Sequence, residues 1–260
     1  TGLILPEAWL VPNTLMVGGG WVSQYPPSHL GLMALFFRLG IPHLVGPVLM
    51  GLMAWILALS FPRLLPDRDR TARTAAILVA VSPFLLALGG GSFNHLTAGF
   101  AGAALLYSAL RAREDGAAWG FATGLAVGLM VTARPWIGLV LGTAFPLLLW
   151  GPELLAGRRR WFLRRALATV GGGIPFAVAL GLYNQRLFGE ITRLGYLAAF
   201  GENHKLGFHL DPWGNMYGLE SALAFTSIDL LAVGVPFLET PLPLTVLVGG
   251  YILLGPRLPG

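Results

Sequence analysis

Arg134 is the residue whose type and surroundings point most directly to chemistry. It lies in the stretch Thr132-Ala-Arg-Pro-Trp136, between two long apolar runs. A planar guanidinium binds phosphate through two parallel hydrogen bonds, and a charge within the apolar part of a membrane protein is often functional. The sequence therefore suggests a phosphate-binding arginine, although an arginine that anchors a helix end by snorkelling would show the same pattern.

Other polar residues that could line a substrate cleft lie in short stretches between apolar runs. Ser23-Gln-Tyr-Pro-Pro27 offers Gln24 and Tyr25 as hydrogen-bonding groups beside a donor phosphate, and His29 follows closely. Tyr25 and His29 could also simply cap and pack a turn. The remaining candidates for the cleft are Asn94, His95, Arg186, His204, Lys205 and His209.

The histidines also have simpler explanations. A residue such as His95, at the start of an apolar run, is often only a hydrogen-bonded residue at the membrane interface. His204 and His209 lie near acidic residues, but their spacing matches no standard zinc signature. The sequence contains no cysteine. We therefore expect no metal and no other cofactor, and we interpret the stretch 201–214 as a loop that contacts substrate.

The composition is that of a membrane protein. Of the 260 residues, 55% are hydrophobic and only 11% are charged, whereas soluble domains carry roughly 25% charged residues. Too little polar surface is left to cover a soluble globule. The isoelectric point near 10.1 would suggest nucleic acid in a soluble protein. Here the basic residues lie in short loops between apolar runs, so we expect no nucleic-acid partner.

Seven apolar runs have the length of membrane-spanning helices, which need about 20 residues. They are Pro42–Leu64, Thr71–Leu88, Phe93–Leu110, Gly116–Ala133, Pro135–Trp150, Trp161–Tyr183 and Pro236–Leu254. The sequence thus predicts an all-α fold, a polytopic transmembrane helix bundle of about seven spans with external loops. Ser28–Leu39 is apolar but too short to span, so we expect an external helix at the membrane surface.

The basic residues orient these spans. If residues 63–73 are cytoplasmic, twelve of the seventeen Lys and Arg residues fall in cytoplasmic segments, as the positive-inside rule requires. The five histidines then lie at or near the external face. We expect an external loop with a juxtamembrane helix (1–41), a six-span bundle (42–184), an external loop (185–235), and a last span with a cytoplasmic end (236–260).

The external stretches, taken together, resemble the GT-C membrane glycosyltransferases. The likeness is to the bacterial branch that contains protein-mannosyltransferases (family 39) and aminoarabinose transferases, in which a Tyr-Pro-Pro or Lys-Pro-Pro stretch ends the first external loop and opens a juxtamembrane helix. It covers nearly the whole chain, in order. The stretches are Ser23-Gln-Tyr-Pro-Pro27, Ser92-Phe-Asn-His95, Thr132-Ala-Arg-Pro135, Tyr183-Asn-Gln-Arg-Leu-Phe-Gly189 and His204-Lys-Leu-Gly-Phe-His209.

The resemblance implies transfer of a sugar from a polyprenyl-phosphate donor to an acceptor at the external face of the bacterial inner membrane, with inversion. The general base of such enzymes is an aspartate early in the first external loop. No residue here matches it, so we expect it upstream of Thr1, together with a further span. Several relatives carry lysine at or next to the position of Gln24, which brings no charge; the positive charge would then come from Arg134, Arg186 or Lys205.

Two other classes of function stay open. A transporter or flippase for a lipid-linked or small polar solute would place polar residues near the middle of the bilayer and show inverted repeats, whereas the polar residues here gather at one end of the spans. A non-catalytic scaffold would need no such concentration of His, Arg and Asn. The expected partners are membrane lipid, a polyprenyl-phosphate sugar, and an acceptor that is a lipid, a glycan or a protein.

Overall fold

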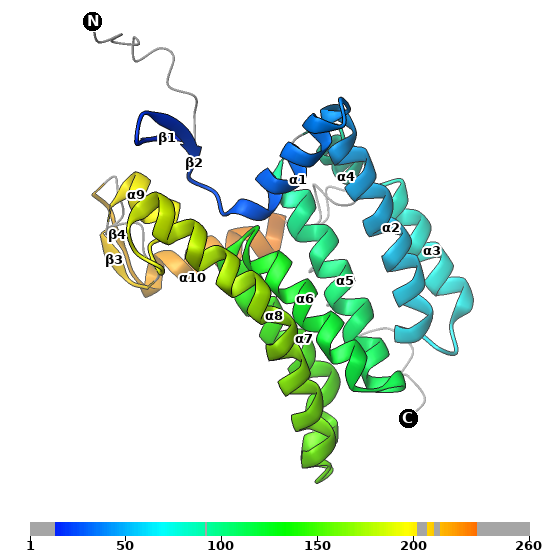
Figure 1. Ribbon diagram of the computed structural model, residues 1–260. Coiled ribbons are helices and arrows are strands. Elements are labelled where there is room, and N and C mark those ends of the chain that lie inside the picture. Colours follow the sequence, from blue (N-terminus) through cyan, green and yellow to red (C-terminus); the bar gives the residue numbers. More distant parts are fainter. Residues whose placement is uncertain (1–13, 92, 202–206, 211–213, 233–260) are drawn as a thin grey trace, which may run out of the picture.

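A computed structural model describes residues 14–91, 93–201, 207–210 and 214–232, which are mostly helical (Figure 1). The elements in chain order are β1 (Thr14–Val17), β2 (Gly20–Ser23), α1 (Pro27–Arg38), the 3-10 helix η2 (Pro42–Leu44), α2 (Val45–Leu64), α3 (Asp69–Ala80), α4 (Pro83–Gly89), α5 (Asn94–Asp115), α6 (Ala117–Val131), α7 (Pro135–Leu155), α8 (Arg159–Phe188), α9 (Gly195–Phe200), β3 (His209–Leu210), β4 (Met216–Tyr217) and α10 (Leu219–Ala232). The strands form two small antiparallel hairpins, β1–β2 and β3–β4. The expected all-α class is confirmed.

Fewer helices than expected meet the length and apolarity of a membrane span. Among the described residues these are Pro42–Leu64, α7 and α8. Helices α3 and α4 could form a fourth span together, bent by 46° between them. Pro83 explains this break, because proline lacks a backbone N–H and disfavours helical geometry in the residue before it.

The expected count of seven spans is not confirmed. Helix α6 has 15 residues, which is short for a span. Helix α5 has 22 residues, but the polar residues at its ends, Asn94 and His95 at the start and the charged residues of 111–115 at the end, keep its mean hydropathy below that of a span. About half of α5 is buried within the protein, so little of its surface needs to suit lipid. The run Pro236–Leu254 lies outside the described residues.

The short apolar helix before the bundle is present as α1. Proline at its first position suits a helix start, because the N–H that proline lacks would have no partner there. Leu35 and Phe37 are 52% and 73% exposed. In Figure 1, α1 lies at the same end of the bundle as the start of α5. An exposed apolar face on so short a helix fits a position at the membrane surface.

Helix α6 lies at the centre of the packing, between α5 and α8. Ala101 and Leu105 of α5 pack with Ala126 and Met130 of α6 in one buried cluster. On the other side, α6 and α8 approach through glycines. A Cβ atom on Gly124 would collide with the backbone of α8. Small residues let helix backbones approach this closely, as is common in membrane bundles.

Polar contacts join α5, α7 and α8 at the opposite end from Arg134. Glu153 is nearly buried and pairs with Arg158 at 2.5 Å. The indole N–H of Trp150 donates to the Ala109 carbonyl over 2.9 Å, and Nε of Arg165 donates to the Ala112 carbonyl over 2.5 Å. These bonds use carbonyl groups near the carboxyl end of α5, where cations are favoured by the helix dipole. The arginines at this end therefore help to hold the bundle together.

The glycine contact predicts a sharp difference between two neighbouring substitutions on α8. In Gly172→Ala the new methyl group would strike the Phe121 carbonyl, whereas in Gly171→Ala its nearest neighbour is a ring carbon of Phe121 at 3.9 Å. We expect Gly172→Ala to cost about 1–3 kcal/mol through overpacking. Gly171→Ala should be neutral or stabilising, because alanine favours a helix. Thermal unfolding in detergent measures both, and equal midpoints would contradict the close packing.

Candidate functional site

The turn between α6 and α7 fixes the position of Arg134. Thr132 is the C-cap that follows the last residue of α6, and Arg134 precedes the first residue of α7 with an extended backbone. The backbone N–H of Arg134 donates to the Met130 carbonyl over 2.7 Å. Pro135 at the first position of α7 favours a helix start there. Helix α6 therefore ends just before the half-buried Arg134, and α7 begins just after it.

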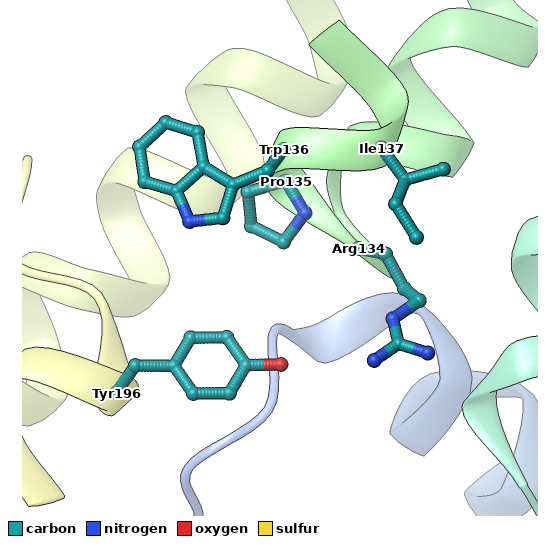
Figure 2. Close-up of a pocket in the computed structure, with 5 residues that line it drawn as sticks. All are labelled: Arg134, Pro135, Trp136, Ile137 and Tyr196. Carbon is teal, nitrogen blue, oxygen red and sulfur yellow. The ribbon is translucent and has the colours of Figure 1, made fainter. Parts of the chain in front are cut away.

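A cavity of about 230 Å³ lies beside this turn. Its lining residues are Arg134, Pro135, Trp136, Ile137 and Tyr196. Figure 2 shows the Tyr196 hydroxyl pointing toward the side of the cavity where the Arg134 guanidinium lies, with the Trp136 indole across from the Tyr196 ring. We call this cavity the polar pocket. It brings a permanent cation, a hydroxyl group and two aromatic rings together.

Burial raises the pKa of Tyr196 to about 12, and the nearby charge of Arg134 offsets part of this rise. The phenol is therefore neutral at physiological pH and can donate a hydrogen bond. An anion in the polar pocket would meet the positive guanidinium and this O–H donor together. Hydrogen bonds between charged donors and phosphate oxygens are among the stronger ones in proteins.

The segment before α1 holds α9, which carries Tyr196, in place. The rings of Tyr25 and Tyr196 pack edge to face, with centroids 5.6 Å apart. Gln24 is 5% exposed, and its backbone lies so close to Gly195 that any side chain there would collide with it. Gln24 and Tyr25 were expected beside a donor phosphate. Neither residue lines the polar pocket. Tyr25 packs against Tyr196, which does line it.

Hydrogen bonds also tie α1 to the bundle next to Arg134. Ser28 donates its backbone N–H to the Thr132 carbonyl over 3.2 Å, and the hydroxyl groups of the same two residues lie 2.5 Å apart. Nδ1 of the buried His29 bonds to the hydroxyl of Thr97 over 2.9 Å. His29 was a candidate for the cleft. The structure gives it a bond that holds α1 against α5.

A second cavity, of about 360 Å³, runs between α5 and α7 and includes Arg134 and His95 in its lining. We call it the α5–α7 groove. The rest of the lining is apolar or glycine, and on α5 it extends from His95 to Leu106. At 1.5 Å per helical residue this is about 16 Å. The groove thus has a charged group near its Arg134 end and hydrocarbon along the rest.

The other expected site residues that the structure describes do not line these cavities. Asn94 is buried, and its amide nitrogen has no hydrogen-bond partner among the described residues. Arg186 is exposed in the last turn of α8. Nδ1 of His209, in β3, bonds to the Gly207 carbonyl over 2.7 Å. His204 and Lys205 lie outside the described residues.

No cluster of three His, Asp or Glu side chains that could hold a metal ion occurs in the described part of the chain. Sequence reasoning named only Arg134 among the lining residues of the polar pocket and missed both of its aromatic residues, Tyr196 and Trp136. Trp136 belongs to the stretch that first identified Arg134, so proximity could have suggested it. Tyr196 lies 62 positions after Arg134 in the sequence, and no sequence signal pairs the two residues.

Comparison of the chain with protein-family models, curated proteins and solved structures finds no match.

The hydroxyl of Thr132 predicts a measurable contribution to stability. Thr132→Val keeps the side-chain shape but removes the contact with Ser28 and the bond to the Gly128 carbonyl. We expect a loss of about 1 kcal/mol and a lower midpoint of thermal unfolding. Thr143→Val is the matched control, because that hydroxyl is exposed and, among the described residues, bonds to the Leu139 carbonyl of its own helix alone. Equal effects of the two variants would contradict a tie between α1 and α6.

The raised pKa of Tyr196 predicts that its tyrosinate forms only at unusually high pH. The difference in tyrosinate absorbance between the natural protein and Tyr196→Phe should have its midpoint near pH 12, instead of the ordinary value of about 10. The folded state holds this proton more tightly, so its stabilising effect is complete below about pH 10 and is lost as the pH rises toward 12. Arg134→Gln should move the midpoint higher still. A midpoint near 10 would contradict the burial of the phenol.

Proposed function

We propose that this protein is a GT-C-type membrane glycosyltransferase that moves a sugar from a polyprenyl-phosphate donor to an acceptor hydroxyl at the external face of the membrane. The observation that carries the proposal is the place of Arg134. It lines both the α5–α7 groove and the polar pocket. Arg134, the one Lys or Arg among the described residues of these linings, therefore lies between a hydrocarbon-lined groove and a pocket of mixed polarity.

A polyprenyl-phosphate sugar has its parts in the same order. Its chain would lie along α5 and α7, its phosphate at Arg134, and its sugar in the polar pocket. Tyrosine and tryptophan offer an apolar face together with a hydrogen-bonding group, which suits a sugar ring with its C–H and O–H groups. The proposal thus accounts for all three features with one ligand.

The reaction needs stabilisation of the departing phosphate. In the proposed step the acceptor oxygen attacks the anomeric carbon, and the bond from that carbon to the phosphate oxygen breaks with inversion. Arg134 and the Tyr196 hydroxyl would stabilise the negative charge that develops on the leaving polyprenyl phosphate. The acceptor proton goes to a carboxylate. Because none of the described lining residues is acidic, we assign this base to the first external loop, as in the enzymes that the chain resembles.

The proposal places the Arg134 end of the bundle outside the cell. Its support is the concentration of arginines at the opposite end, where the turn between α7 and α8 and the start of α8 carry Arg158, Arg159, Arg160, Arg164 and Arg165. Basic residues are enriched in cytoplasmic segments of membrane proteins. A lipid-linked sugar exposed on the outer leaflet would then reach the groove from the side.

Removal of the Arg134 charge tests the proposal. Arg134→Gln should weaken binding of polyprenyl phosphate to the purified protein in nanodiscs by about 10- to 100-fold, since a hydrogen-bonded charge contributes about 1.5–3 kcal/mol. Transfer from polyprenyl-phosphate sugars should fall at least as much. Arg134→Lys should recover part of the binding, because a lysine supplies charge without the planar fork.

Arg186→Gln is the matched control for charge. It removes an exposed arginine from the last turn of α8, outside the linings of the groove and the polar pocket. We expect it to bind polyprenyl phosphate like the natural protein. Unchanged binding in Arg134→Gln, or an equal loss in both variants, would reject Arg134 as the phosphate-binding residue.

A further inference from the structure

Three arginines in the first two turns of α8 carry charges that the bundle does not use. Arg159, Arg160 and Arg164 are exposed, and none of them forms an ion pair with another described residue. Their neighbours differ, because Arg158 pairs with a carboxylate and the buried Arg165 donates to a helix carbonyl. The first turn of α8 contains no acidic residue. We call the three exposed residues the arginine patch.

An exposed apolar stripe continues from the arginine patch along α8. Its residues recur every three or four positions, so they lie on one face of the helix, and each is at least 54% exposed: Leu163, Leu167, Val170, Ile174, Val178 and Leu182. Leu182 lies 19 positions after Leu163, a rise of about 29 Å at 1.5 Å per residue. The hydrocarbon core of a bilayer is about 30 Å thick. The stripe therefore has the length and the exposure of a surface that faces lipid chains.

The arginine patch lies at one end of this stripe. Arg160 and Arg164 are about one turn apart on α8, some 6 Å along its axis, and they neighbour Leu163 and Leu167 at helical spacings of three and four residues. Figure 1 shows the turn between α7 and α8 at the end of the bundle opposite α1. Where hydrocarbon ends in a bilayer, the lipid phosphates begin. Long arginine side chains can extend to that level from the helix.

We propose that the arginine patch binds the head group of an anionic membrane phospholipid, whose acyl chains lie against Leu163 and Leu167. Guanidinium groups bind phosphate oxygens through paired hydrogen bonds, and the further positive charge favours a lipid with net negative charge. The inference does not depend on glycosyl transfer. In the orientation proposed above, the arginine patch faces the cytoplasmic leaflet, where anionic lipids attract basic segments that flank a span.

The exposed leucines favour a lipid over a water-soluble acidic partner. An acidic peptide or a nucleic acid would contact the charges from the aqueous side and would leave Leu163 and Leu167 uncovered. Leu155, the last residue of α7, is 90% exposed, so an apolar side chain lies on the other side of the same turn. Positive charge beside exposed hydrocarbon is the pattern of a surface that meets both parts of a phospholipid.

The variants remove charge without disturbing the contacts within the bundle. Arg160→Gln with Arg164→Gln takes two charges from the arginine patch and leaves the ion pair of Arg158 and the hydrogen bond of Arg165 in place. Glutamine has nearly the helix propensity of arginine. Arg38→Gln with Arg186→Gln is the matched control, because it removes two exposed arginines from the last turns of α1 and α8.

The experiment measures lipid contact in nanodiscs of phosphatidylcholine. A trace of phosphatidylglycerol with a diazirine in an acyl chain is added, or phosphatidylcholine with the same diazirine, and labelled residues are located by mass spectrometry. In the natural protein we expect phosphatidylglycerol to label residues 163–170 roughly fivefold more than phosphatidylcholine at low ionic strength. The Arg160/Arg164 variant should bring this ratio to about one, and the Arg38/Arg186 variant should leave it unchanged.

Three results would overturn the inference. The first is equal labelling of residues 163–170 by the two lipids in the natural protein. The second is an unchanged ratio in the Arg160/Arg164 variant, and the third is an equal fall in both variants, which would reflect net charge alone. If the lipids label equally while a hexaglutamate peptide binds the natural protein and not the Arg160/Arg164 variant, the arginine patch serves a water-soluble acidic partner instead.

Discussion

The close approach of α6 to its neighbours is the constraint on which the rest of the structure depends. Glycines 124 and 172 bring α6 and α8 nearly into backbone contact, and Ala101 and Ala126 lie in the buried cluster between α5 and α6. Close packing is a main source of helix association in a membrane, where hydrophobic burial adds little. Because α6 is fixed on both sides, the turn that follows it, with Arg134, has a fixed position.

The fixed turn holds the positive charge of Arg134 in partly apolar surroundings, where a charge without a partner is costly. Arg134 is half-buried, and a cation in an apolar environment needs a partner or water. Among the described residues, Arg134 forms none of the ion pairs that join the arginines at the far end of the bundle. A lipid phosphate would supply the missing negative charge. This physical argument underlies the proposed donor site.

The two ends of the bundle use arginine differently. Around Glu153, Arg158 pairs with a carboxylate and Arg165 donates to a helix carbonyl, so their charges are used within the protein. At the other end, α1 and the segment before it are joined to α5, α6 and α9 by neutral groups, through the Ser28–Thr132 and His29–Thr97 bonds and the Tyr25–Tyr196 contact. Because these contacts are neutral, they leave Arg134, the one Lys or Arg among the described residues of the polar pocket, available to a ligand.

The sequence by itself determined what depends on local composition. The apolar runs predicted the all-α class, and the prolines that start helices predicted the short helix α1. The position of Arg134 between two apolar runs made it the first candidate for a binding site. The expected count of seven spans is not confirmed among the described residues, because an apolar run looks like a span in the sequence whether lipid or protein surrounds it. Helices α5 and α6 do not reach the length and apolarity of spans.

Only the tertiary structure decided which polar residues meet. It joined Tyr196 to Arg134, gave His29 a bond to Thr97, and left Arg186 and His209 away from the pocket. It also revealed the α5–α7 groove beside that pocket. Such features arise where helices distant in sequence come together, and their contacts depend on the angles and spacing set by packing. A single sequence records the periodicity of each helix but not the spacing between helices.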